Sequence, residues 1–159
     1  MDNNKYIEMA YKEALKAYKQ KEVPVGCVIV RNGEVIAKAY NKREQKKNSL
    51  CHAEIICINK ACKKLGEKFL DGCEIYITLE PCIMCVGAII QARIGKIVYG
   101  ANEPKFGCLE SLGNVLESYK FNHHVNVVSG VQAEKISELM KKFFKEIRNS
   151  KQASKNDNN

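Results

Sequence analysis

The spacing of apolar residues switches between helix-like and strand-like periods along this chain, and that order of elements most constrains its fold. Residues 3–20 place apolar side chains at helical spacing between lysines, which predicts an amphipathic helix. The Asn32-Gly33 dipeptide then separates two short apolar runs. This pattern is typical of a β-hairpin over residues 25–40.

After the hairpin, segments with the two periods alternate. Further strands are predicted at residues 74–79, 96–100 and 125–128. Helices are predicted from near His52 to Gly66, from Pro81 to Ala92 and from Ala133 to Arg148. This order predicts an α/β fold, a three-layer α/β/α sandwich around a central mixed five-stranded sheet. Residues 150–159 are polar and predict a frayed tail, which leaves residues 1–149 as one domain.

The charge balance is basic, because 26 Lys and Arg residues against 18 Asp and Glu residues give a formal net charge of +8. Such an excess favours an anionic partner, nucleic acid before membrane, although a lysine-rich solubilising surface explains it equally well. No apolar run approaches the ~20 residues that span a bilayer, and the first residues do not resemble a signal peptide. We therefore expect a cytoplasmic protein without a membrane partner.

Eight cysteines occur in a chain with no secretion signal, which indicates reduced thiols rather than disulfides. Cys27, Cys57 and Cys62 have apolar neighbours and are expected in the core. Cys82 and Cys85 have the spacing of metal ligands. Alone, that spacing also fits a redox pair or half of a structural zinc site. A further ligand elsewhere in the chain is needed to distinguish these from a catalytic metal site.

His52 supplies that ligand, because it lies in the first turn of one predicted helix and the two cysteines lie in the first turn of another. Three protein ligands leave a fourth zinc position open for water, which is the arrangement of a catalytic site. The N-termini of helices also favour the thiolate form of both cysteines. Cys51 is expected to be a packed thiol, and His123 and His124 are expected to be surface or loop-capping residues.

Glu54 lies two residues beyond His52 and is displaced around the predicted helix, so it need not bind the same metal. Zinc lowers the pKa of bound water toward ~7, and a nearby carboxylate can pass the proton to a ring and to departing ammonia. His52, Cys82 and Cys85 together with Glu54 therefore predict one zinc ion per subunit and hydrolytic deamination of a nucleobase.

Two motifs, His52-Ala53-Glu54 and Pro81-Cys82-Ile83-Met84-Cys85, resemble those of zinc-dependent cytidine and nucleobase deaminases. Landmarks across residues 1–149 are similar to the bacterial tRNA-specific adenosine deaminase family, among them Glu22-Val23-Pro24-Val25-Gly26, Asn41, Thr78-Leu79-Glu80, Tyr99-Gly100-Ala101 and Phe143-Phe144. The resemblance implies a cytidine deaminase-like fold and a homodimer. It also implies that the substrate is the wobble adenosine of a tRNA anticodon loop and that the product is inosine.

The same resemblance implies a set of substrate contacts. Asn41 would contact the flipped nucleotide, the Ala53 backbone would orient its base, and Val23 would form a wall of the pocket. Phe144 and the basic residues up to Arg148 would meet the anticodon loop, because a basic groove can grip the flanking phosphates.

Three positions depart from the family: Glu103 replaces an Asp, Glu110 replaces a Gly and His124 replaces an Arg. Glu103 and Lys105 would lie beside the RNA, so these departures bear on substrate contacts rather than on the chemistry. One alternative is a deaminase of free guanine, cytosine or cytidine, which would need no long RNA surface. The other is a non-catalytic RNA-binding module that uses zinc for stability.

Overall fold

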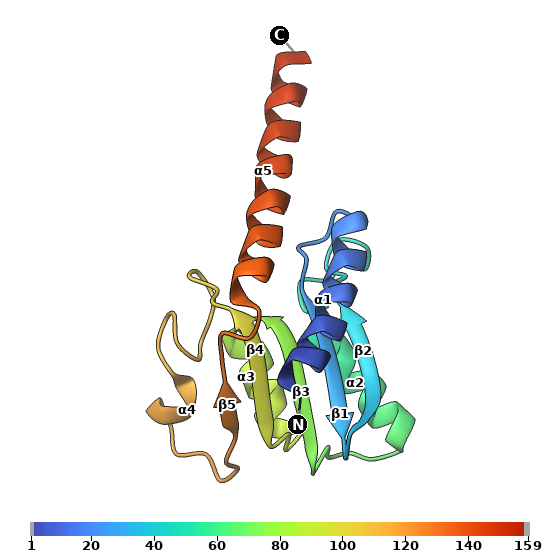
Figure 1. Ribbon diagram of the computed structural model, residues 1–159, viewed down its shortest axis with the longest axis vertical. Helices are drawn as coiled ribbons and strands as arrows, with labels where there is room; N and C mark the ends of the chain where they lie inside the picture. Colours follow the sequence, from blue (N-terminus) through green and yellow to red (C-terminus); the bar gives the residue numbers. More distant parts are fainter. Residues whose placement is uncertain (1, 158–159) are drawn as a thin grey trace.

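The computed structural model describes residues 2–157, which form one five-stranded sheet with helices on both faces (Figure 1). The strands are β1 (Gly26–Arg31), β2 (Glu34–Tyr40), β3 (Cys73–Leu79), β4 (Lys96–Ala101) and β5 (Asn126–Val128), in the order β2-β1-β3-β4-β5. β1 is antiparallel to both of its neighbours, whereas β3, β4 and β5 are parallel. The predicted mixed sheet is confirmed.

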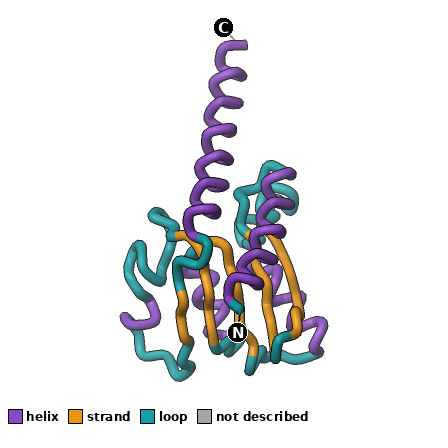
Figure 2. Tube along the Cα trace, viewed as in Figure 1, coloured by secondary structure: helices purple, strands orange, loops and turns teal. Residues whose placement is uncertain are grey.

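The helices are α1 (Asn3–Lys19), α2 (Ala53–Leu65), α3 (Ile83–Gln91), the short α4 (Val115–Ser118) and α5 (Ala133–Asp157). α1 and α5 cover one face of the sheet and α2 and α3 the other (Figure 2). The residues of β1 divide accordingly, since Cys27 and Ile29 pack with α2 and α3, and Val28 and Val30 pack with α1 and α5. Both faces of β1 are therefore buried, as its continuous apolar run requires.

None of the helices within residues 2–157 combines the length and the hydropathy of a membrane span. The core contains two of the three predicted core cysteines, because Cys27 and Cys57 are fully buried. Cys62 is only partly buried and packs against the edge of the core.

Two glycines fix the geometry around β1. Asn32 (φ 50°) and Gly33 (φ 76°) both have positive φ, which is the conformation of the tight hairpin turn that this dipeptide predicts. A Cβ atom on Gly26 would overlap the carbonyl oxygen of Ala10. Only glycine therefore allows α1 to lie this close to β1.

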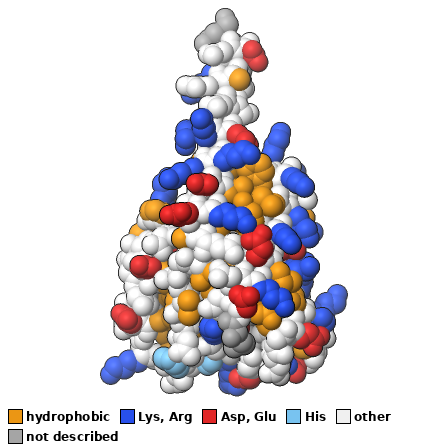
Figure 3. Space-filling view, in the orientation of Figure 1, with side chains coloured by type: hydrophobic (Ala, Val, Ile, Leu, Met, Phe, Trp, Pro, Cys, Tyr) orange, Lys and Arg blue, Asp and Glu red, His pale blue; other side chains and the backbone are white. Residues whose placement is uncertain are grey.

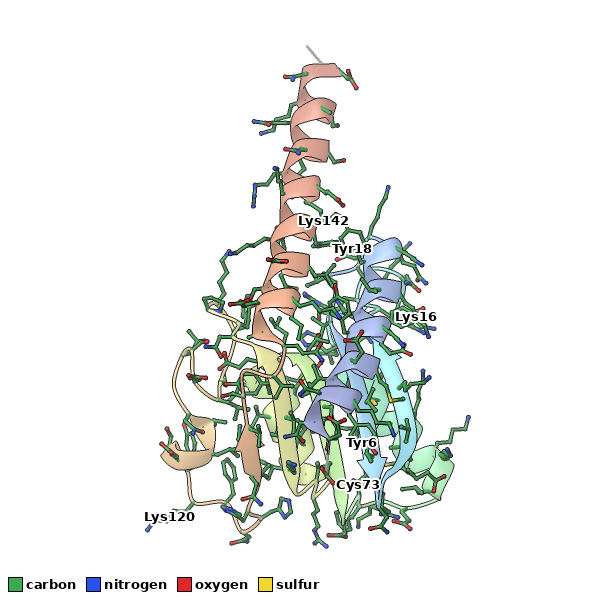
Figure 4. All side chains as sticks on the ribbon, in the orientation of Figure 1. Tyr6, Lys16, Tyr18, Cys73, Lys120 and Lys142 are labelled. Carbon is green, nitrogen blue, oxygen red and sulfur yellow. The ribbon has the colours of Figure 1, made fainter. Side chains whose placement is uncertain are left out.

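The first half of α5 docks on the domain and its second half projects beyond it (Figure 1). The docked half buries one helical face, which consists of Ile136, Leu139, Met140 and Phe143. Tyr18 of α1 faces the same helix, where the Nζ atom of Lys142 lies 5.4 Å from the centre of its ring (Figure 4). The Phe143 ring lies 6.1 Å from Tyr18, measured between centroids.

The prediction of a frayed tail was wrong for residues 150–157, because they continue α5 to Asp157. The segment contains no Gly or Pro, and its Lys, Gln and Ala residues favour a helix. The docked half already provides the helix nucleus, so extension costs little. All side chains of residues 150–157 are exposed. Residues 158 and 159 of the predicted tail lie outside the described residues.

Candidate active site

The three predicted metal ligands meet where α2 and α3 begin. His52 is the N-cap of α2, Cys82 is the N-cap of α3, and Cys85 lies in the first turn of α3. The Nδ1 atom of His52 lies 3.7 Å from Cys82 Sγ and 3.6 Å from Cys85 Sγ, and all three ligand atoms lie within 4.8 Å of one another. Zinc–sulfur and zinc–nitrogen bonds at tetrahedral angles place N and S about 3.5 Å apart. The residues therefore fit one zinc ion.

Hydrogen bonds among the three ligand side chains shift their pKa values. A hydrogen bond with Cys85, and a further one with His52, lower the pKa of the Cys82 thiol to about 4, against the opposing effect of burial. The hydrogen bond with Cys82 raises the pKa of Cys85, and burial adds to that increase. Cys82 also raises the pKa of His52. A negative charge thus rests on Cys82 at neutral pH, and a metal ion would displace the protons that remain on the other ligands.

Other thiols and histidines of the chain have contacts of their own. Cys108 Sγ donates to the carbonyl oxygen of Phe106 at 3.4 Å, and His123 Nε2 lies 2.7 Å from the carbonyl oxygen of Ile94. Within residues 2–157, no fourth His, Cys or acidic side chain, Cys51 included, joins the cluster. An ion held by the three ligands would keep an open coordination position, as catalytic zinc requires.

Glu54 lies in the first turn of α2 and is only 4% exposed. Burial raises the pKa of its carboxyl, while its own backbone N–H, His52 and the Cys85 thiol act in the opposite direction. The net shift is upward, toward the range in which a carboxyl can both accept and return a proton.

A groove of about 520 Å³ lies between α5 and the loops that follow α1 and β2. Four of the predicted substrate contacts line it, namely Val23, Asn41, Phe144 and Arg148. Asn41 is held from two sides, because its Nδ2 donates to the Val23 carbonyl oxygen and its Oδ1 accepts the Arg43 N–H, each at 3.2 Å. The structure thus brings these four residues together.

The other three predicted contacts do not line this groove. Ala53 is fully buried at the first position of α2. Glu103 and Lys105 lie in the loop after β4, where Glu103 Oε1 accepts the N–H of Lys105 at 2.9 Å. They belong to the surroundings of Cys82 rather than to the α5 side of the site, because Gly107 of the same loop pairs with Cys82.

Positive charge predominates along the groove and the helix that borders it. The basic residues that line the groove are Lys21, Arg43, Arg148 and Lys151, against two acidic ones, Glu22 and Glu44. Figure 3 shows Lys and Arg side chains along the projecting half of α5. A backbone hydrogen bond joins the chain beside the groove to the chain beside the metal centre, since the Lys42 N–H donates to the Cys51 carbonyl oxygen at 3.1 Å.

Sequence reasoning missed two buried carboxylates that hold the loops of the site. Glu22 is fully buried and accepts the N–H groups of Glu44 and Gln45 at 2.9 Å each. Glu80 is 3% exposed and accepts several N–H groups of the loop after β4, among them that of Glu103. Both glutamates belong to motifs quoted above, Glu22-Val23-Pro24-Val25-Gly26 and Thr78-Leu79-Glu80. A single glutamate in a sequence does not, however, indicate which distant backbone N–H groups its carboxylate will bind.

Known proteins share both the sequence and the fold. Residues 1–148 match the MafB19-like deaminase family. A tRNA-specific adenosine deaminase of Bacillus subtilis (strain 168) is 47% identical over 94% of this chain and 93% of its own length. One of Aquifex aeolicus (strain VF5) is 42% identical over 94% of this chain and 99% of its own length.

A solved structure from work on A-to-I editing by tRNA deaminases at the wobble position of transfer RNA is 40% identical to this chain. It superposes with a TM-score of 0.81 over 85% of this chain and 98% of its own. The chain therefore belongs to the MafB19-like deaminases and, among them, to the tRNA-specific adenosine deaminase family.

Proposed function

We propose that this protein converts the wobble adenosine of a tRNA anticodon to inosine by hydrolytic deamination. One observation carries the proposal: an open three-ligand site formed by His52, Cys82 and Cys85 lies at the same helix start as the buried carboxyl of Glu54. The relatives at 42% and 47% identity are named tRNA-specific adenosine deaminases, which supports this substrate.

His52, Cys82 and Cys85 would hold one zinc ion per subunit. Zinc in such a site makes a water molecule nucleophilic near neutral pH. Glu54 carries one proton from the water to a ring nitrogen of the purine and a second to the departing amino group. A C–O bond forms as the C–N bond breaks and ammonia leaves, so the reaction consumes only water.

The groove supplies contacts to the RNA around the reacting base. Asn41 hydrogen-bonds the extruded nucleotide, Val23 forms a wall beside it, and the Ala53 backbone orients the base. Phe144 is 41% exposed, and an exposed aromatic ring can stack on an unpaired base. Arg148 binds phosphate on the same side of the groove.

Glu103 and Lys105 approach the RNA from the loop after β4. Lys105 adds a positive charge for a phosphate, whereas the carboxylate of Glu103 binds the backbone of its own loop and shapes the loop's edge.

We also propose a homodimer, in the cytoplasm where tRNA resides. Large apolar side chains are exposed around the start of α3: Ile83 is 59% exposed, Phe106 66% and Leu112 60%. A second copy of the chain would cover them. Analytical ultracentrifugation should give twice the 18.0 kDa chain mass. Ile83→Asp and Phe106→Asp should each shift the protein toward the monomer.

Parallel assays of the zinc-loaded protein test the substrate. An anticodon stem-loop, adenine, guanine, cytosine and cytidine are incubated separately, and the products are identified by mass spectrometry. We expect inosine in the stem-loop. Activity on a free base alone would favour the base-deaminase alternative, and zinc-containing protein that deaminates nothing would favour the RNA-binding module.

A further inference from the structure

Glu80 is a buried carboxylate between β3 and the ligand Cys82, and the proposed chemistry does not use it. Its Oε1 accepts the Glu103 N–H at 3.0 Å and the Ser111 hydroxyl. Its Oε2 accepts the N–H groups of Leu109 at 3.1 Å, Glu110 at 2.7 Å and Ser111 at 2.9 Å. All five donors belong to one segment, residues 102–111. A buried carboxylate is tolerated only when it is bonded in this way.

The segment that Glu80 binds also forms the support of the metal ligand. Gly107 pairs with Cys82 in a β-bridge, and the Cys108 N–H donates to the Pro81 carbonyl oxygen at 3.0 Å. A Cβ atom on Gly107 would overlap the Glu80 carboxyl group. The carboxylate, Gly107 and the backbone of Cys82 therefore pack directly on one another.

The same segment carries Glu103 and Lys105, which the proposed function places beside the RNA. The Glu103 N–H binds Glu80 directly, and the Lys105 N–H binds the Glu103 carboxylate. One buried carboxylate thus connects a metal ligand with a substrate-facing loop.

We propose that Glu80 is a positioning residue that holds residues 102–111 against Cys82. It thereby sets both the orientation of the Cys82 thiolate toward the metal and the placement of Glu103 and Lys105 toward the substrate. The role at the metal stands on geometry alone, and the role at the substrate rests on the proposed function. Neutralising Glu80 removes an acceptor from a site that five donors surround.

Glu80→Gln tests this role with almost no change in side-chain volume. The amide group would face N–H donors that it cannot satisfy, so the segment shifts from Cys82. We expect a different visible absorption spectrum in the cobalt-substituted protein, because thiolate-to-metal charge transfer reports ligand orientation. We also expect kcat/KM for the stem-loop to fall about 100-fold, the loss expected for a displacement of about 1 Å.

Two variants separate positioning from general stability. Glu13→Gln changes another buried carboxylate, 4% exposed and paired with Lys16 at 3.0 Å. It should keep the wild-type cobalt spectrum and kcat/KM within about twofold. Ser111→Ala removes one of the five bonds and keeps the charge. It should change the cobalt spectrum and kcat/KM in the same direction as Glu80→Gln, by a smaller factor.

A Glu80→Gln protein that folds and keeps both the wild-type spectrum and kcat/KM would overturn the proposal. If that protein does not fold, Ser111→Ala decides, and a wild-type cobalt spectrum and kcat/KM in that variant would overturn the proposal as well. Lack of stem-loop activity in the wild-type protein would instead count against the proposed function. In that event the cobalt spectra still decide the role of Glu80 at Cys82.

Discussion

The metal centre and the substrate groove are built in opposite ways. The metal centre comes from two short motifs at helix starts, and its Cys85 and Glu54 are 0% and 4% exposed. The groove is assembled from three segments that are far apart in the sequence, residues 21–23, 41–44 and 143–151. Its Phe144 is 41% exposed, and one wall is a helix whose far half makes no core contacts.

The contrast separates chemistry from recognition. Buried groups at helix starts keep fixed distances from one another. The reaction needs those distances because small displacements of the reacting groups lower its rate. Exposed aromatic and basic side chains each add a small amount of affinity for RNA, and that contribution tolerates movement of the side chain. Changes in the metal centre should therefore abolish turnover and spare RNA binding, whereas changes in the groove should weaken binding and largely spare kcat.

Removing the metal should have the largest effect. Dialysis against a chelator should abolish deamination and lower Tm, because the ion stabilises only the folded state. The Kd for an anticodon stem-loop, measured by fluorescence anisotropy, should change by less than about threefold, since the groove does not include the ligands. Added zinc should restore activity. If removal of the metal also abolished RNA binding, the metal centre and the groove would not act as separate regions.

Glu54→Ala should lower kcat by about 10²- to 10⁴-fold, the usual contribution of a general acid-base. Metal content by mass spectrometry and stem-loop Kd should stay near wild type, because Glu54 is neither a ligand of the cluster nor part of the groove. Glu67→Ala, which changes an exposed carboxylate, is the control. Turnover that survives in the Glu54 variant would contradict the proton-transfer role.

Asn41→Ala should raise KM for the stem-loop about fivefold with little change in kcat, since one hydrogen bond to the nucleotide is worth about 1 kcal/mol. Steady-state kinetics separate the two parameters. Asn59→Ala, at an exposed position of α2, is the matched control. A fall in kcat with KM unchanged would move Asn41 from recognition to chemistry.

The double variant Arg148→Gln and Lys151→Gln should weaken stem-loop binding severalfold at low salt. It should also reduce the slope of log K against log salt, by about 0.7 for each single-strand phosphate that the variant no longer neutralises. Lys63→Gln with Lys64→Gln removes the same charge from the end of α2, away from the groove. Equal slopes for the two double variants would show that binding depends on net charge alone.

The smallest effect is expected outside both regions, at the Arg31–Glu67 pair, whose Nη2 and Oε2 atoms are 2.8 Å apart. The hydrogen bond from Arg31 lowers the pKa of Glu67 in the folded state, so its stabilisation is present at neutral pH. It is lost as the pH falls through the lowered pKa. Calorimetry should show a slightly lower Tm for Glu67→Gln at neutral pH and no difference in acid. Any change in turnover would mean that the active site responds to general stability.

The sequence by itself determined the parts of this protein that depend on short-range geometry. The Asn32-Gly33 turn follows from two adjacent residues, and the alternation of periods gives the order of helices and strands. Cys82 and Cys85 lie three residues apart at one helix start, and His52 and Glu54 lie two residues apart at another. Each of these patterns acts within about one turn of chain, where backbone geometry alone fixes which side chains are neighbours.

Only the tertiary structure decided how those local pieces meet. His52 reaches Cys82 across 30 residues, and Glu80 binds N–H groups that lie 23 to 31 residues away. Residues 150–157 looked like a tail because their own composition is polar, but the docked half of α5 extends them as a helix. In each case the stabilising partner lies outside the local segment, so the outcome depends on packing that no local pattern encodes.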